Sequence, residues 1–126
     1  MLDKDITQYN DNGEPHGYCE TYYLNGQLYY KGHYLNGKLH GYWEEYSSNG
    51  KLSFKGHYKD NKLHGYFESY WNNGTLWYKG NYINGIRHGY WEQYHINGQL
   101  HFKGHYNHGK RIGLWIENNK ELFYAQ

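Results

Sequence analysis

Aromatic and polar positions recur along the chain with a period of 24 residues. Two series of glycines mark this period, one formed by Gly17, Gly41, Gly65, Gly89 and Gly113 and the other by Gly32, Gly56, Gly80 and Gly104. Each unit, for example residues 41–64, holds two short aromatic-rich runs, and each run ends in a short turn, most often Asn-Gly. A fixed period of this length indicates tandem structural repeats.

The turns predict strands rather than helices. Asn and Gly accept the positive φ of tight hairpins, the turns are only about a dozen residues apart, and tyrosine favours extended backbone. We therefore expect an all-β fold, an elongated single-layer antiparallel β-meander with two strands in each 24-residue repeat. Residues 17–112 form four repeats, residues 1–16 an N-terminal cap with a partial repeat, and residues 113–126 a C-terminal partial repeat or cap.

Alternation of side chains assigns each strand position to one of two sheet faces. In residues 41–64 it places on one face Tyr42, Glu44, Tyr46, Leu52, Phe54, Gly56 and Tyr58. It places on the other face Trp43, Glu45, Ser47, Ser53, Lys55 and His57. The first set hardly varies between repeats, which is typical of a structural ladder of cross-strand pairs. Its glycine column leaves room for a neighbouring ring to lie over the backbone.

Two positions on the second face change together from repeat to repeat. The four pairs are Tyr23 with Tyr29, Ser47 with Ser53, Trp71 with Trp77, and His95 with His101. This matching predicts contact across the hairpin, either directly opposite or diagonally. It requires a loop of odd length around Asn-Gly, such as three residues with a bulge.

Half of each unit resembles the MORN repeat, whose pattern is Tyr-x-Gly-x-aromatic-x-x-Gly-x-x-His-Gly. Residues 30–41 (YKGHYLNGKLHG) and 78–89 match it fully, residues 54–65 carry Phe54 and Asn61 instead, and residues 102–113 carry Phe102 and Ile112. The other half, Gly-x-aromatic-Glu-x-Tyr-x-x-Asn-Gly-x-Leu, is similar to the bacterial variant found in the YwqK-type antitoxin family. The resemblance implies an elongated antiparallel meander that serves as a scaffold, dimerising module, phospholipid-headgroup binder or toxin neutraliser.

Composition indicates which side chains form the core of such a sheet and which classes of partner and cellular location are expected. Of 126 residues, 21% are aromatic, including 18 Tyr and five Trp, so the core is expected to be aromatic rather than aliphatic. The formal net charge of +1 disfavours nucleic acid as a partner. Cys19 is the single cysteine of the sequence and permits neither an internal disulfide nor a cysteine zinc site. The sequence shows neither a signal peptide nor an apolar span, so we expect a soluble, cytoplasmic protein.

Regularly spaced histidines and glutamates are expected to be structural. His16, His40, His64 and His88 lie one unit apart, too far to share a metal ion, and are predicted to bond turn backbone groups. A stacked or exposed His95/His101 pair is favoured over a metal site. Glu20, Glu44, Glu68 and Glu92 are interpreted as acceptors for tyrosine hydroxyls, because a repeated column offers no distinguished catalytic pair.

The second face carries the candidate binding residues. The predicted partner-binding set consists of Tyr23, Tyr29, Trp43, Phe67, Trp71, Trp77, Trp91, His95 and His101, since aromatic side chains often anchor protein interfaces. An anion or headgroup site would use Lys31, Lys55, Lys79 and Lys103, although the same lysines suit a solvated strand face.

These candidates favour a non-enzymatic module that binds another protein, with an antitoxin or inhibitor as the more specific hypothesis. The alternatives are a peripheral membrane scaffold and a carbohydrate-binding protein that uses its aromatic platforms. Sheet edges would also permit homo-oligomers. No catalytic residue, cofactor or metal is predicted.

Overall fold

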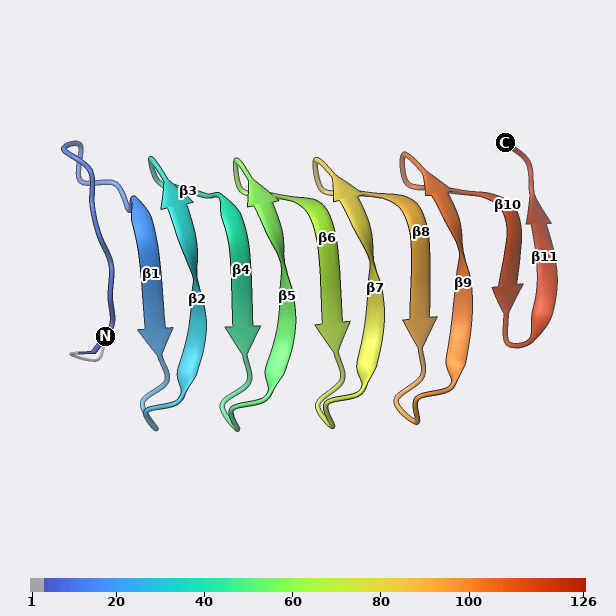
Figure 1. The fold of residues 1–126 in the computed structure, drawn as a ribbon, viewed down its shortest axis with the longest axis horizontal. Coiled ribbons are helices and arrows are strands. Elements are labelled where there is room, and N and C mark those ends of the chain that lie inside the picture. The colour runs from blue at the N-terminus through green and yellow to red at the C-terminus, as the bar shows by residue number, and fades with distance from the viewer. Residues whose placement is uncertain (1–3) are drawn as a thin grey trace.

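The computed structural model describes residues 4–126 and shows one 11-stranded antiparallel sheet. Its strands are β1 (Gly17–Tyr22), β2 (Leu28–Leu35), β3 (Lys38–Leu39), β4 (Gly41–Tyr46), β5 (Leu52–Lys59), β6 (Lys62–Tyr70), β7 (Leu76–Ile83), β8 (Ile86–Tyr94), β9 (Leu100–Asn107), β10 (Lys110–Glu117) and β11 (Lys120–Tyr124). Strands adjacent in the chain are adjacent in the sheet, with the short β3 paired to β2. This order confirms the predicted all-β, single-layer meander with two strands per repeat (Figure 1).

One end of the sheet carries two-residue turns. Asp60-Asn61 joins β5 to β6 with φ of 50° and 69°, and Asn84-Gly85 joins β7 to β8 with φ of 49° and 81°. Positive φ at both central residues matches the right-handed twist of the flanking strands, which explains the Asn and Gly preference at these positions.

The opposite end carries four longer loops centred on Asn-Gly, and the two-residue turn Asn118-Asn119 between β10 and β11. In the loop from β4 to β5, the Ser47 N–H donates to the Lys51 carbonyl (2.8 Å) and the Lys51 N–H donates to Asn49 Oδ1 (3.0 Å). Ser47 therefore lies opposite Lys51 and diagonal to Ser53. The equivalent backbone bonds occur in all four Asn-Gly loops.

A β-bulge follows each Asn-Gly loop and corrects the predicted faces. Tyr46 pairs with Leu52, but Glu45 pairs with Phe54, so Ser53 is an extra residue in the second strand. The extra residue reverses the alternation of the rest of β5. Phe54, Gly56 and Tyr58 therefore lie on the face of Trp43, whereas Lys55 and His57 lie opposite Glu44 and Tyr42 on the other face.

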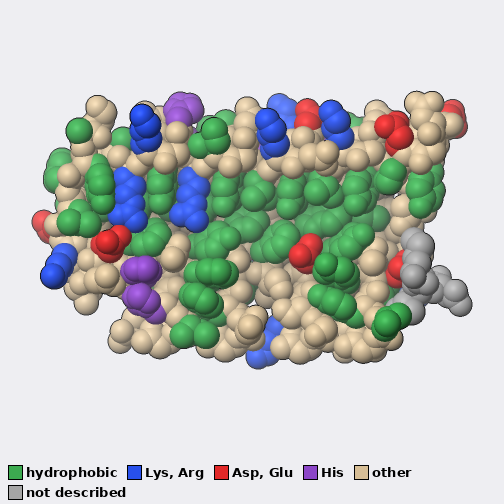
Figure 2. All heavy atoms as spheres, turned by 180° about the vertical axis from the view of Figure 1, so that it is seen from behind, with side chains coloured by type: hydrophobic (Ala, Val, Ile, Leu, Met, Phe, Trp, Pro, Cys, Tyr) green, Lys and Arg blue, Asp and Glu red, His purple; other side chains and the backbone are tan. Residues whose placement is uncertain are grey.

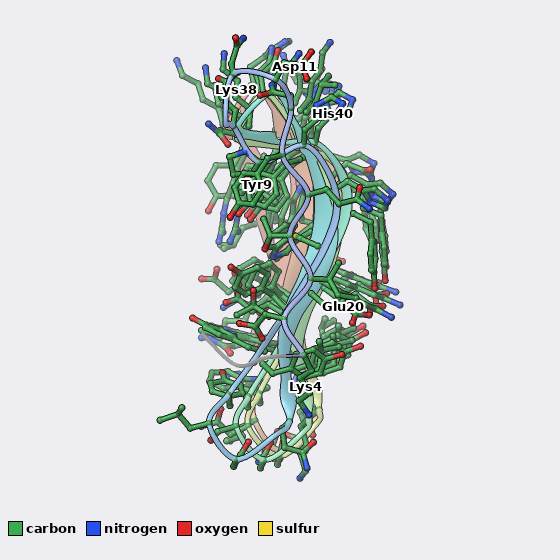
Figure 3. The ribbon with its side chains drawn as sticks, turned by 90° about the vertical axis from the view of Figure 1, so that its left-hand side faces the viewer. Lys4, Tyr9, Asp11, Glu20, Lys38 and His40 are labelled. Carbon is green, nitrogen blue, oxygen red and sulfur yellow. The ribbon has the colours of Figure 1, made fainter. Side chains whose placement is uncertain are left out.

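We name the two faces by their content. The aromatic face carries the Trp and Phe rings of the first strands. The Glu/Lys face carries two tyrosines from each repeat and two charged columns, Glu20, Glu44, Glu68 and Glu92 and Lys31, Lys55, Lys79 and Lys103. Viewed along the sheet, the side chains of successive repeats superimpose on both sides of the ribbon, with Tyr9 on one side and Glu20 on the other (Figure 3). Each face is therefore a set of straight columns that run across the strands.

The two glycine series serve different physical purposes. Gly80 lies beneath the ring of Trp91, where an added Cβ would come within 2.2 Å of ring carbons. Gly89 has open space around it but a φ of +77°, in the left-handed region that disfavours other residues. The predicted role of the series Gly32, Gly56, Gly80 and Gly104, to let a ring lie over the backbone, is confirmed, and the ring comes from the aromatic face.

The ends of the sheet differ. At the N-terminal end, residues 4–16 run beside β1, and Ile6 and Glu20 exchange backbone hydrogen bonds of 2.9 Å. At the C-terminal end, β11 is the last strand of the sheet, and 82% of Phe123 is exposed. Within residues 4–126 no helix has the length and apolarity needed to cross a bilayer.

Candidate functional site

One side chain from each repeat fills the middle of the aromatic face. This core column consists of Cys19, Trp43, Phe67, Trp91 and Trp115, each at most 5% exposed. Trp91 stacks on Tyr78 with ring centroids 6.0 Å apart and meets Tyr82 edge-on at 5.0 Å. Because each ring lies flat over a glycine and between neighbouring rings, the column forms a hydrophobic core without a second layer.

Burial of the core column corrects part of the predicted partner-binding set. That set includes Trp43, Phe67 and Trp91, which do lie on the same face as Trp71 and Trp77. Only 5%, 5% and 0% of the three side chains is exposed, so they offer almost no surface to another protein. The sequence does contain a signal for this burial. A large ring recurs once in each 24-residue unit, and a glycine that can lie beneath it recurs with the same period.

The covarying residues touch in all four repeats, as predicted. We call them the hairpin-end pairs. The ring centroids are 4.5 Å apart in Tyr23/Tyr29 and 4.2 Å apart in both Trp71/Trp77 and His95/His101, and the hydroxyls of Ser47 and Ser53 lie 2.9 Å apart. All three ring pairs are stacked. Figure 2 views the aromatic face. Below its central hydrophobic band lie hydrophobic and histidine clusters that polar surface separates from one another.

Some hairpin-end pairs also join neighbouring hairpins. The Tyr23 hydroxyl donates to the Tyr46 carbonyl (2.7 Å), and Trp71 Nε1 donates to the Tyr94 carbonyl (3.0 Å). These bonds satisfy the polar atoms and fix the tilt of the rings. The apolar ring surface stays partly in solvent, since Trp71 and Trp77 are only half-buried.

The Glu/Lys face is built on glutamates that each bind two tyrosine hydroxyls. These clamp glutamates, with their donors two residues before and after, are Glu20 (Tyr18, Tyr22), Glu44 (Tyr42, Tyr46), Glu68 (Tyr66, Tyr70) and Glu92 (Tyr90, Tyr94). The predicted role as hydroxyl acceptors is confirmed. Spacing of two residues along one strand brings both rings to the same face as the carboxylate.

The clamp shifts the pKa values of its members in opposite directions. Burial alone would raise the pKa of Glu68, but hydrogen bonds from Tyr66 and Tyr70 and the nearby Lys55 ammonium hold it below its ordinary value. Burial and the bond to Glu44 raise the pKa of Tyr46 to about 12. A carboxylate that stays charged and hydroxyls that stay protonated make the clamp a stable structural element near neutral pH.

The predicted anion-binding lysines lie on the Glu/Lys face, not beside the tryptophans. Lys31, Lys55 and Lys79 form ion pairs with Glu44, Glu68 and Glu92 at 3.3, 3.3 and 3.4 Å. Cross-strand pairing makes the charges alternate in sign from Glu20 on β1 to Lys103 on β9. Lys103 is exposed, and its partner on the following strand β10 is Ile116, because the glutamate column ends at Glu92.

The prediction that the histidines before Gly17, Gly41, Gly65 and Gly89 bond turn backbone groups is confirmed for three of the four. Nδ1 of His16, His64 and His88 accepts a hydrogen bond from the backbone N–H of Asn36, Asn84 and His108, at 3.0, 3.2 and 3.2 Å. At the turn near His40, the Leu39 N–H donates instead to Asn61 Oδ1 (2.7 Å). Among residues 4–126 no group of three or more His, Cys, Asp or Glu is placed to hold a metal ion.

Two arginines complete the aromatic face, and sequence analysis missed both. The Arg87 guanidinium lies over Trp91 at 4.3 Å, and the Arg111 guanidinium lies over Trp115 at 4.1 Å. The signal was available in the repeat alignment: the position holds Pro15, Leu39 and Leu63 in earlier units and arginine in the last two. A guanidinium covers a ring as a leucine does and adds hydrogen-bond donors.

The molecule is thus an open repeat sheet with one uniform face and one face on which side chains differ between repeats. A family model described as a MORN repeat variant matches residues 15–36, 39–60, 63–84 and 87–108, more than half of the chain. The chain belongs to this family of MORN repeat variants. Repeats of this kind mediate protein or membrane interactions. A search of curated proteins finds no match.

Proposed function

We propose that the chain is a non-enzymatic repeat module that binds another protein through the hairpin end of its aromatic face. The stacked, half-buried Trp71/Trp77 pair carries the proposal. Ser47 and Ser53 occupy the same place one repeat earlier, within the same strand geometry. Because the fold accepts serine there, two tryptophans are more than the sheet requires, and partly exposed tryptophan is a frequent anchor of protein interfaces.

The more specific proposal is that the bound protein is a toxin or enzyme that the module neutralises. Its support is the similarity of the first half of each unit to the bacterial repeat variant of the YwqK-type antitoxin family. An adjacent reading frame that encodes a toxin-like protein would support it, and growth rescue on co-expression would test it. Co-expression that leaves the neighbouring protein fully toxic would contradict it.

Ion pairing weighs against the membrane alternative. Three of the four lysines that could bind lipid phosphates are held within 3.4 Å of a glutamate. A lipid headgroup would have to compete with that carboxylate, and the alternating signs along the face cancel its long-range field.

Pulldown from the native host tests the proposal. The double variant Trp71→Ser/Trp77→Ser copies the pair found at Ser47 and Ser53, so the sheet should persist while the captured protein is lost. Leu114→Ser is the matched control, because Leu114 is 47% exposed and lies on the Glu/Lys face. Capture of the same protein by the double variant would refute the assignment of the surface.

A further inference from the structure

Arg87 is a cation of the aromatic face without a carboxylate partner among residues 4–126. Its guanidinium lies 4.3 Å from the Trp91 ring, 5.3 Å from Tyr78 and 5.7 Å from Tyr106. Its Nη1 donates to the Tyr106 hydroxyl at 3.3 Å, the Tyr82 hydroxyl is a further hydrogen-bond partner, and the ion pairs found among residues 4–126 do not include it. A guanidinium has five N–H donors in a planar fork, so most of its capacity is unused.

The next repeat shows what such an arginine binds. Arg111 holds the equivalent place over Trp115 and donates to Glu117 Oε1 at 3.0 Å and to the Tyr124 hydroxyl at 3.1 Å. These bonds keep the pKa of Arg111 above its ordinary value despite burial. One unit earlier, the residue equivalent to Glu117 is Gln93, so the repeat that contains Arg87 lacks the acid.

Arg87 also continues the surface that carries the proposed function. Trp77 meets Tyr78 edge-on with ring centroids 5.2 Å apart, and Tyr78 in turn lies under the Arg87 guanidinium. A partner resting on the tryptophan pair would therefore reach the arginine within one continuous patch. Figure 2 shows basic side chains lying within the hydrophobic band of this face.

We propose that Arg87 is the anchor for an acidic side chain of the bound protein, which supplies in trans the carboxylate that Glu117 supplies to Arg111. The inference rests on the proposed function and adds the chemistry of the partner: an Asp or Glu next to an apolar or aromatic residue. The ring beneath holds the guanidinium in place and partly desolvates it, so that a bidentate carboxylate gains more than it would at a mobile surface arginine.

Two variants of the full chain separate this role from a structural one. Arg87→Leu installs the residue found at Leu39 and Leu63, so the rings stay covered while the charge is lost. Gln93→Glu keeps the arginine and recreates the pairing of Arg111 with Glu117, which should neutralise the anchor from within. Lys103→Gln is the control, because it removes one positive charge from the opposite face at an exposed side chain.

The probe is a library of random 12-residue peptides displayed on phage and selected on the wild-type chain. We expect enriched peptides to contain Asp or Glu beside an apolar residue. Their affinity should fall at least about tenfold on Arg87→Leu and on Gln93→Glu, and should stay within about twofold on Lys103→Gln. Changing the peptide's acid to its amide should weaken binding to the wild type but not further weaken binding to Arg87→Leu.

The outcomes distinguish this inference from the proposed function. Peptides that need the tryptophan pair but bind the two Arg87-directed variants normally would overturn the inference alone. Selection that enriches no peptide, or only peptides without an acid, would also overturn it. Binding of anionic phosphatidylserine vesicles through Arg87, with no peptide selected, would overturn both and favour a membrane surface as the partner.

Discussion

Gly80→Ala tests the central physical feature of the fold, a ring that replaces a second sheet. The added Cβ would lie 2.2 Å from Cδ2 and Cε2 of Trp91 and 2.6 Å from Cγ, whereas ordinary contacts begin at 3.4 Å. The indole must therefore move away from the sheet by about 1.2 Å, the difference between 3.4 and 2.2 Å. Because Gly80 does not have a positive φ, the backbone itself accepts alanine, and the effect isolates the ring.

The magnitude follows from what Trp91 loses when it moves. The indole is fully buried, stacks over Tyr78, meets Tyr82 edge-on and lies under Arg87. Overpacking typically costs 1–3 kcal/mol, and full loss of a buried tryptophan 3–5 kcal/mol, so we expect about 2–4 kcal/mol. For a chain of this size that corresponds to a melting temperature lower by about 10 °C.

The assay is chemical denaturation of the full chain, followed by far-UV circular dichroism and tryptophan fluorescence. Gly74→Ala is the matched control: nothing lies within 4 Å of its added Cβ, but its φ is +89°. It should lose only the left-handed backbone preference, about 1–2 kcal/mol. Combining Gly80→Ala with Trp91→Ala should show strong coupling, because the alanine at position 91 removes the clash.

Additive free energies in that double-mutant cycle would refute the reasoning. So would a Gly80→Ala variant within about 0.5 kcal/mol of wild type, which is the range for surface changes without structural consequence. Either result would mean that the indole is not held against the glycine backbone.

Two further predictions concern the clamp on the Glu/Lys face. Folding lowers the pKa of the clamp glutamates and raises that of Tyr46 to about 12. The urea concentration at the unfolding midpoint should therefore be constant near neutral pH, fall as the pH drops below about 4.5, and fall again as the pH rises from about 10 to about 12. Equal midpoints at pH 7 and 3 would contradict this. Glu68→Gln removes the negative charge that Tyr66, Tyr70 and Lys55 all contact, and it should destabilise the folded protein by about 1–3 kcal/mol. Lys103→Gln, at the exposed end of the row of charges, should cost less than about 0.5 kcal/mol. Thermal unfolding measures both.

Much of the architecture could be predicted because its determinants are local. The 24-residue period, the Asn-Gly turns and the matched residues at Trp71 and Trp77 each involve residues close in sequence. Turn chemistry constrains φ directly, and a contact across a short hairpin leaves a paired change in the sequence. The class of fold and the contacts of the hairpin-end pairs could therefore be inferred before any coordinates were known.

The assignment of faces could not be made in the same way. A bulge at Ser53 shifts alternation in the second strand, and whether a strand contains a bulge depends on which backbone groups pair across strands. The matched pairs indicate a loop of odd length whether or not the following strand contains a bulge. Simple alternation therefore predicts Lys55 on the face of Trp43, whereas the structure pairs it with Glu44 and Glu68 on the other face.

The sequence alone thus determined a repeating antiparallel sheet, its turns and the residues that touch at its hairpin ends, because these depend on short-range backbone preferences. The tertiary structure decided which tryptophans are core and which are surface, since burial depends on neighbouring repeats. Trp91 lies over Gly80 of the adjacent strand β7 and is covered by Arg87, whereas Trp71 lies at the hairpin end and is only half-buried. It also decided that Arg87 lacks the acid that Arg111 has, because only the packed geometry shows which side chains meet across a repeat.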